Sequence, residues 1–240
     1  MTETLHRVAH RGYSAVAPEN TLPALLAGVH AGATFIEFDV RTTADGVPVV
    51  IHDRTVDRTT DGSGKVWELT LDQVAGLDAG TWFSGAYAGV GVPRLTEVLE
   101  LLAPYARDRV ELLLEVKNIL GLVADAGLLE RTVVQSFDPA IVRLAGDASG
   151  EVRRGFLRDP FDTSQVEVAR ELGVSFVNPS MTAVLGSPET VAELAEAGVA
   201  VMPWTANDLT LWPDLVGAGV AGLITDRTGE LTGWTSRAQS

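Results

Sequence analysis

Cysteine is absent from the 240 residues of the sequence. This absence excludes disulfide bonds, thiolate nucleophiles and cysteine-ligated zinc. Any catalytic or metal-binding chemistry must therefore rest on oxygen and nitrogen side chains. The cellular compartment is not fixed by the absence, which only removes the evidence for an oxidising one.

Long apolar runs are also absent. No stretch approaches the roughly 18 consecutive apolar residues that a membrane-spanning helix needs, so we expect no stable membrane insertion. The opening residues, Met1 to Leu5, have neither the cationic start nor the apolar stretch of a signal peptide. We therefore expect a cytoplasmic protein.

Basic side chains are in the minority, with 18 Lys and Arg against 32 Asp and Glu, a formal net charge of −14. A surface this acidic repels phosphate polymers and anionic headgroups, which argues against nucleic acid as a partner. A small anionic substrate could still bind where local cations or a metal ion reverse the field. The sequence does not indicate an oligomeric state.

Short β-like runs alternate with amphipathic helical stretches, a pattern that predicts βαβ units and a parallel sheet. The Gly-rich fingerprint of a dinucleotide-binding sheet is missing after the first strand. About eight strand–helix pairs fit a TIM (β/α)8 barrel, predicted as one α/β domain over residues 1–240 with a small insertion at about 53–93. The expected strands are residues 6–10, 34–40, 47–51, 110–116, 132–135, 152–157, 174–177, 199–204 and 219–224.

The expected strand at residues 34–40 carries two carboxylates, Glu37 and Asp39. Residues two apart share one face of a strand, so these side chains point together while Ile36 and Phe38 face the helices. Paired carboxylates on an apolar strand are costly without a cation, and a hard divalent ion would relieve that cost. The alternative is a surface-facing acidic pair on an edge strand.

The run at residues 110–116 places Glu115 and Lys117 on one face by the same spacing. Glu115 would supply a third carboxylate at a neighbouring strand end and complete a metal site. Lys117 could contact an anionic ligand held by the metal, or form a salt bridge with one of the acids.

Two histidines follow expected strands. His10 is followed by Arg11, a side chain suited to bidentate phosphate contact, and His52 follows the strand at residues 47–51. Histidine is the side chain most readily poised near neutral pH. Because these groups stand at successive strand ends, they indicate the catalytic face of a barrel. His6 and His30 do not belong to this set of groups at strand ends, and we interpret both as structural.

These motifs together resemble the glycerophosphodiester phosphodiesterase family. The resemblance spans nearly the whole chain and is carried by His10-Arg11-Gly12, Pro18-Glu19-Asn20-Thr21, Glu37-Phe38-Asp39-Val40, Thr43-Ala44-Asp45-Gly46, His52-Asp53 and residues 57–64, with later echoes at residues 93–95, 115–117, 136–138, 204–207 and 225–227. Its one departure is a short connection after Lys117.

The resemblance implies a TIM barrel that binds Mg²⁺ or Ca²⁺ and hydrolyses small glycerophosphodiesters to glycerol 3-phosphate and an alcohol. In that family the residues matching His10 and His52 act as acid and base. Those matching Glu37, Asp39 and Glu115 hold the metal, and those matching Arg11 and Lys117 contact phosphate.

Trp204 ends the strand expected at residues 199–204, on the catalytic face of a barrel. Its indole offers a flat apolar wall and one N–H donor, which suits the glycerol end of a substrate. The alternative is a core aromatic. Two other functions stay open: a phospholipase D-type barrel acting on lysophospholipids, with Trp67 and Trp82 of the insertion facing lipid, and a barrel that binds glycerophosphodiesters without catalysis.

Overall fold

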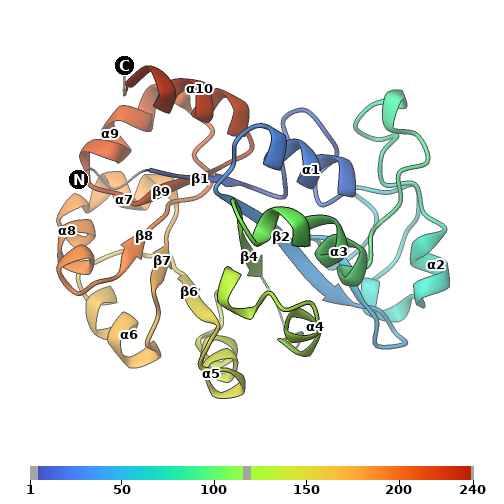
Figure 1. The fold of residues 1–240 in the computed structure, drawn as a ribbon, viewed down its shortest axis with the longest axis horizontal. Helices are drawn as coiled ribbons and strands as arrows, with labels where there is room; N and C mark the ends of the chain where they lie inside the picture. Colours follow the sequence, from blue (N-terminus) through green and yellow to red (C-terminus); the bar gives the residue numbers. More distant parts are fainter. Residues whose placement is uncertain (1–4, 116–119, 239–240) are drawn as a thin grey trace.

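A computed structural model describes residues 5–115 and 120–238. Over these residues, parallel strands follow one another in the order β8-β7-β6-β5-β4-β2-β1-β9, and the helices lie outside them (Figure 1). The two ends of this order also meet, because the Ala221 amide donates to the Val201 carbonyl (2.9 Å) and the Ile224 amide to the Pro203 carbonyl (3.0 Å). The prediction of a TIM barrel is confirmed.

The barrel strands are β1 (His6–Ala9), β2 (Phe35–Thr42), β4 (Glu111–Glu115), β5 (Thr132–Ser136), β6 (Arg153–Leu157), β7 (Phe176–Asn178), β8 (Ala200–Val201) and β9 (Gly222–Thr225). The α-helices are α1 (Leu22–His30), α2 (Leu71–Ala75), α3 (Leu95–Ala106), α4 (Leu120–Asp125), α5 (Pro139–Ala148), α6 (Gln165–Leu172), α7 (Met181–Gly186), α8 (Pro188–Glu196), α9 (Trp212–Gly217) and α10 (Thr228–Ala238). Within the described residues, each helix is too short or too polar to cross a bilayer.

The expected strand at residues 47–51 is not a barrel strand. It forms β3 (Pro48–Val50), which runs antiparallel to β2 with Val50 opposite Val40. The reason is the tight turn before it, where Gly46 adopts a φ of 82°. Such a short connection only reverses the chain, whereas a parallel neighbour needs a long crossover.

Alternation along β2 separates two layers of the core. Phe35 packs inside the barrel with Val8 and Leu113, all at most 1% exposed. Ile36 and Phe38 point outward and belong to the cluster built with helix residues such as Leu25, Leu95 and Val98. The predicted facing of this strand is therefore confirmed.

The loop after β1 approaches helix α1 so closely that only glycine fits. Gly12 has a φ of 80°, and a Cβ placed on it would lie 2.4 Å from the backbone carbon of Ala24. A positive φ is costly for any side chain with a Cβ, and here a backbone clash is added. This contact fixes the position of Arg11, the residue before it.

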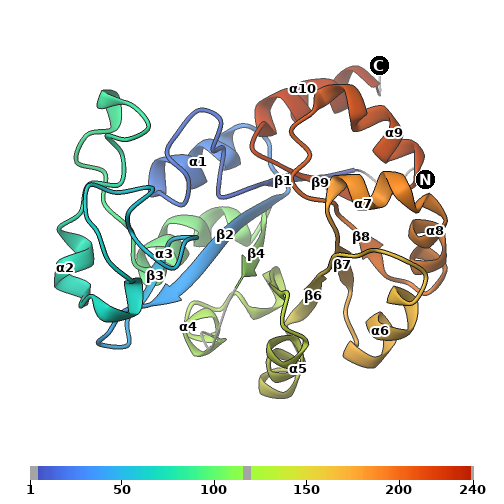
Figure 2. The ribbon, with the colours of Figure 1, turned by 180° about the vertical axis from the view of Figure 1, so that it is seen from behind.

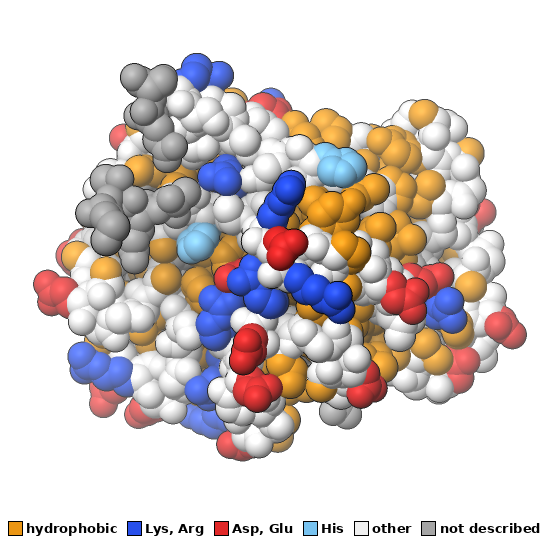
Figure 3. Space-filling model, viewed as in Figure 1, with side chains coloured by type: hydrophobic (Ala, Val, Ile, Leu, Met, Phe, Trp, Pro, Cys, Tyr) orange, Lys and Arg blue, Asp and Glu red, His pale blue; other side chains and the backbone are white. Residues whose placement is uncertain are grey.

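Several arginines stabilise the barrel away from the carboxyl ends of its strands. Each donates to a carbonyl at the carboxyl end of a helix, where cations are favoured: Arg7 to Gly32 (2.9 Å), Arg131 to Ala106 (2.7 Å) and Arg154 to Leu172 (2.9 Å). In Figure 3, Lys and Arg side chains gather toward the middle of the face shown.

The insertion lies beside the barrel, beyond β2 and β3 (Figures 1 and 2). It contains α2 and two short 3-10 helices, Val66–Glu68 and Gly85–Tyr87. Its apolar side chains form their own buried cluster, in which Val56 and Val74 pack with Val49 of β3. This packing holds the segment after His52 against the barrel.

Candidate active site

A cavity of about 380 Å³ opens at the carboxyl ends of the barrel strands. The sequence predicts eight catalytic, metal-binding or substrate-binding residues, and seven of them line this cavity: His10, Arg11, Glu37, Asp39, His52, Glu115 and Trp204. The eighth, Lys117, lies outside the described residues. His6 and His30 lie elsewhere, with their rings edge-on to Phe35 and Tyr105.

Three carboxylates lie together at the ends of adjacent strands. Glu37 and Asp39 are only 2% and 5% exposed, and Asp39 pairs in register with Glu115 of β4. Because β2 lies between β1 and β4, the alternative of an acidic pair on an edge strand is wrong. Burial raises the pKa of Glu37 well above its usual range, and the charges of Asp39 and Glu115 raise it further. The pKa of Glu115 is also raised, first by burial and then by the negative charge of Asp39.

Arg11 offsets part of this negative charge with both its backbone and its side chain. Its φ of 55° is rare for a residue with a Cβ, and its amide donates to Glu37 Oε2 (2.8 Å). Its guanidinium donates to Glu19 (2.8 Å), and its Nε lies 3.5 Å from Asp39 Oδ2. Asn20 donates to the same Asp39 oxygen (2.8 Å).

Each catalytic candidate histidine is oriented by a carboxylate. His10 Nδ1 lies 2.6 Å from Asp226, and His52 Nδ1 lies 2.6 Å from Asp53. With Nδ1 committed to a carboxylate, the proton is held there and Nε2 is left for chemistry. No described residue hydrogen-bonds to Nε2 of either ring, and both rings line the cavity.

Asp226 follows β9 and is the centre of a small polar network. Burial raises its pKa, but hydrogen bonds from His10, Asn207 and Ser14 outweigh that effect and lower the pKa to about 2. It therefore stays ionised opposite His10. The motif at residues 225–227 marked this position in the sequence, but nothing in that motif indicated that Asp226 would contact His10.

Asp53 is connected to the carboxylate cluster through alternating charges. Arg58, from the insertion, donates to Asp53 (2.6 Å) and with two nitrogens to Glu19 (2.8 Å each). Hydrogen bonds from Arg58 and then His52 lower the pKa of Asp53 to about 2. Since Glu19 also accepts from Arg11, the chain of contacts runs from His52 to Asp39. The side chains of Glu19 and Arg58 were not predicted to take part.

Trp204 lines the cavity, but its N–H is already used. The indole Nε1 donates to the Asn178 carbonyl (2.8 Å), so the expectation of a donor for the substrate is wrong. The rings of Trp204 and Phe137 are nearly perpendicular, with centroids 5.7 Å apart. The pair forms an apolar wall, and Phe137 was not among the predicted site residues.

The described part of the chain holds no set of three His, Asp or Glu side chains placed to hold an ion as they stand. One oxygen of Glu37 and one of Asp39 are turned toward Arg11 and Asn20. The second oxygen of each receives no hydrogen bond from a described residue. The donors are those that a hard divalent cation uses, and their mutual repulsion favours one.

The model of the glycerophosphoryl diester phosphodiesterase family matches residues 10–230. The chain belongs to this family. A glycerophosphodiester phosphodiesterase from Caldanaerobacter subterraneus is 33% identical to it over 231 residues, covering 91% of this chain and 93% of that protein. This match confirms the family predicted from the motifs, and with it an enzyme of the phosphoric diester hydrolase class.

Solved structures of family members agree with the fold. A glycerophosphodiester phosphodiesterase from Agrobacterium tumefaciens has a TM-score of 0.83 and 31% identity, covering 95% of this chain and 99% of that one. A phosphodiesterase from Oleispira antarctica, solved with the product sn-glycerol-3-phosphate, has a TM-score of 0.85 and 28% identity. The match covers 98% of this chain and 97% of that one.

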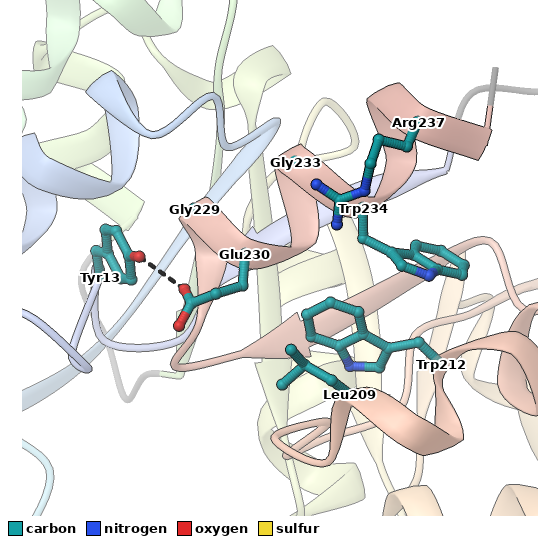
Figure 4. Close-up of a pocket in the computed structure, with 8 residues that line it drawn as sticks. All are labelled: Tyr13, Leu209, Trp212, Gly229, Glu230, Gly233, Trp234 and Arg237. Carbon is teal, nitrogen blue, oxygen red and sulfur yellow. Dashed lines mark hydrogen bonds between the residues drawn. The ribbon is translucent and has the colours of Figure 1, made fainter. Parts of the chain in front are cut away.

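A separate cavity of about 360 Å³ lies outside the barrel of this phosphodiesterase, against α9 and α10 (Figure 4). Its carboxylate, Glu230, accepts from the Tyr13 hydroxyl (2.7 Å), and Trp212 meets Trp234 edge-on. None of the candidate catalytic residues lines it. The Tyr13–Glu230 bond ties the loop that carries Arg11 to helix α10.

The network around Asp226 gives a prediction for this phosphodiesterase that can be measured as stability against pH. With a folded pKa of about 2 and an ordinary value of 3.8, ionised Asp226 stabilises the fold by roughly 1–2 kcal/mol at neutral pH. Because the folded pKa is the lower one, this contribution is complete above about pH 5 and is lost as the pH falls toward about 2. Asp226→Asn should therefore have a lower free energy of unfolding than wild type at about pH 7. The difference between the two proteins should narrow to about half by about pH 3.

Denaturant titrations at several pH values measure the gap. Asp147→Asn, which changes an exposed carboxylate on α5, should follow wild type throughout. A gap for Asp226→Asn that stays constant from pH 7 to pH 3 would contradict the assignment.

Proposed function

We propose that the protein hydrolyses glycerophosphodiesters to glycerol 3-phosphate and an alcohol, with His10 and His52 as acid and base and a divalent ion bound by Glu37, Asp39 and Glu115. The observation that carries the proposal is the convergence of two carboxylate-oriented histidines and three carboxylates on one cavity. The relatives' activity and the glycerol 3-phosphate bound in the Oleispira antarctica enzyme support it.

The proposed ion is Mg²⁺ or Ca²⁺, because the donors are carboxylate oxygens. When bound, it would supply Lewis-acid stabilisation of charge on the phosphoryl oxygens. It would also relieve the repulsion that raises the pKa of Glu37 and Glu115.

The chain's own residues would carry the proton transfers. One histidine accepts a proton at Nε2 from the nucleophile, and the other donates one to the departing alkoxide. Asp226 and Asp53 hold the rings by Nδ1 and stabilise whichever ring is protonated. The nucleophile is either water or the neighbouring hydroxyl of glycerol. In the second case the alcohol leaves as a cyclic phosphate forms, and water then opens the cyclic phosphate to glycerol 3-phosphate. Arg11, and Lys117 outside the described residues, are the proposed phosphate contacts.

Trp204 is proposed to recognise glycerol by its indole face. Because its N–H is bound to Asn178, it contributes shape and apolar contact rather than a hydrogen bond. Phe137, half exposed at 50%, would extend the same wall.

Lysophospholipids are a second candidate substrate class. Trp82 of the insertion is 42% exposed and stands edge-on to Phe83, which in turn meets Tyr87. Exposed aromatic side chains of this kind are suited to a lipid interface. Comparing glycerophosphocholine with lysophosphatidylcholine decides between the classes, because the proposal expects the water-soluble diester to be the better substrate.

Metal dependence is the first test of the proposed function. Release of glycerol 3-phosphate from glycerophosphocholine should stop in excess chelator and return with Mg²⁺ or Ca²⁺. Glu37→Gln and Glu115→Gln should each lose most of the activity, whereas Glu171→Gln, on exposed α6 surface, should not. The ion should also raise the melting temperature of wild type, because it binds the folded site. Full turnover in chelator would rule out the metal.

The histidines are tested by leaving-group chemistry. His10→Ala and His52→Ala should each lower turnover of glycerophosphocholine at least roughly 100-fold, as for other acid–base groups. A p-nitrophenyl diester, whose leaving group needs no proton, should rescue whichever variant lost the acid. His30→Ala is the control and should keep normal turnover. Near-normal turnover of glycerophosphocholine by either active-site variant would disprove its role.

The proposed role of Trp204 is tested by a ratio. Trp204→Ala should reduce the preference, in kcat/KM, for glycerophosphocholine over bis(p-nitrophenyl) phosphate, a diester that contains no glycerol. Thermal melts with and without the ion show whether the variant is folded and still binds it. An unchanged ratio in a folded variant would mean that Trp204 takes no part in choosing glycerol.

A further inference from the structure

A second cavity, of about 350 Å³, adjoins the catalytic one at the end of β2. The two share Asp39 and Glu115, which line both. Beyond these carboxylates the second cavity is bounded by Arg41, Arg54 and Trp67, and we call it the arginine groove. It runs from the carboxylate cluster toward the insertion.

The shared carboxylates decide how a diester would lie, provided that the proposed function is correct. A phosphodiester has one phosphorus and two ester arms. If a divalent ion at Asp39 and Glu115 held the phosphate, one arm would enter the cavity walled by Trp204 and the other would enter the arginine groove. If glycerol occupies the first, the departing alcohol occupies the second.

The protein pairs the arginines of the groove only in part. Arg54 is exposed, and its side chain makes no hydrogen bond or ion pair with any described residue. Arg41 donates by Nε to the His52 carbonyl (2.6 Å), which leaves its terminal nitrogens without a described partner. The acids that face the groove, Asp39 and Glu115, are the ones assigned to the divalent ion.

Trp67 gives the groove an apolar side wall. It is 47% exposed, and Lys65 Nζ lies 5.7 Å from its ring centroid. Lys65 is itself paired with Glu68 (2.8 Å), so it adds little free charge. The groove thus combines a flat ring with Arg41 and Arg54, whose fork of N–H donors matches carboxylate and phosphate groups.

We infer that the arginine groove is the leaving-group subsite and that it selects alcohols carrying an additional anionic group, a phosphate or a carboxylate. A cationic alcohol such as choline meets Arg54 and is disfavoured there. This selectivity is local, because the protein as a whole carries a formal charge of −14.

The test compares substrates whose alcohols carry different charges. Glycerophosphoinositol and glycerophosphoinositol 4-phosphate share one ring, and glycerophosphocholine adds a cationic alcohol. Wild type should show the highest kcat/KM for the phosphorylated inositol substrate. Salt screens exposed charge pairs. This preference should therefore shrink when the salt concentration is raised from about 0.05 M to about 0.5 M, which shortens the Debye length roughly threefold.

Arg54→Gln should lower the ratio of kcat/KM for phosphorylated over unphosphorylated substrate by roughly two- to fivefold, the size expected for one exposed charge pair. Arg54→Glu should lower it further and favour glycerophosphocholine. Arg107→Gln and Arg107→Glu repeat the same charge changes on an exposed residue after α3, at the opposite end of the barrel. Both controls should leave the ratio at the wild-type value.

The outcomes separate this inference from the proposed function. Hydrolysis of all three substrates by wild type, with equal ratios in the Arg54 and Arg107 variants, would overturn the subsite and leave the proposed function standing. Failure of wild type to hydrolyse any of the three, with the ion present, would overturn the proposed function and the subsite with it. A fall in the ratio confined to folded Arg54 variants, checked by thermal melts, would establish the subsite.

Discussion

Repulsion among three clustered carboxylates, two of them buried, is the constraint on which the site depends. Glu37 and Asp39 are fixed two residues apart on β2, and hydrogen bonding between strands brings Glu115 alongside Asp39. Neither burial nor proximity favours ionisation, and the raised pKa of Glu37 is the direct consequence. A strand of this kind is stable in a barrel only if neighbouring elements supply positive charge or donors.

The residues that donate to these carboxylates are positioned by backbone of positive φ, and not only by the length of their side chains. Arg11 and Asn20 both adopt positive φ, at 55° and 58°, and both donate to the carboxylates. Gly12 allows this loop to lie against α1 where a Cβ would clash. The insertion then contributes Arg58, which joins Glu19 to Asp53 and so orients His52. His52, one of the two proposed acid–base groups, and the proposed metal donors Glu37 and Asp39 are therefore held by one continuous network.

The sequence predicted the side chains that point into the barrel better than the contacts that orient them. Period-two spacing was sufficient for Glu37, Asp39 and Glu115, because a strand alternates strictly between its faces. The strand at residues 47–51 was misplaced because an apolar run does not show whether its partner is parallel or antiparallel. Asp226 could not be matched to His10, since they are 216 residues apart and meet only when β9 pairs with β1. The bond from Trp204 to a backbone carbonyl leaves no trace in the side-chain pattern.

The distribution of arginine explains how an acidic protein could still recognise an anionic substrate. Arg7, Arg131 and Arg154 are committed to helix ends, and Arg58 is committed to Glu19 and Asp53. Arg11 is shared between the carboxylates and the cavity. Cations that serve the fold are held by protein acceptors and have little attraction left for a ligand. Arg54, which has no described partner, would therefore attract an anionic leaving group more strongly than its exposure suggests. The acids that line the groove with it, Asp39 and Glu115, are those that a divalent ion would neutralise. Selectivity for the leaving group would then depend on the metal as well as on Arg54, since the same groove without the ion presents Asp39 and Glu115 to an incoming anion.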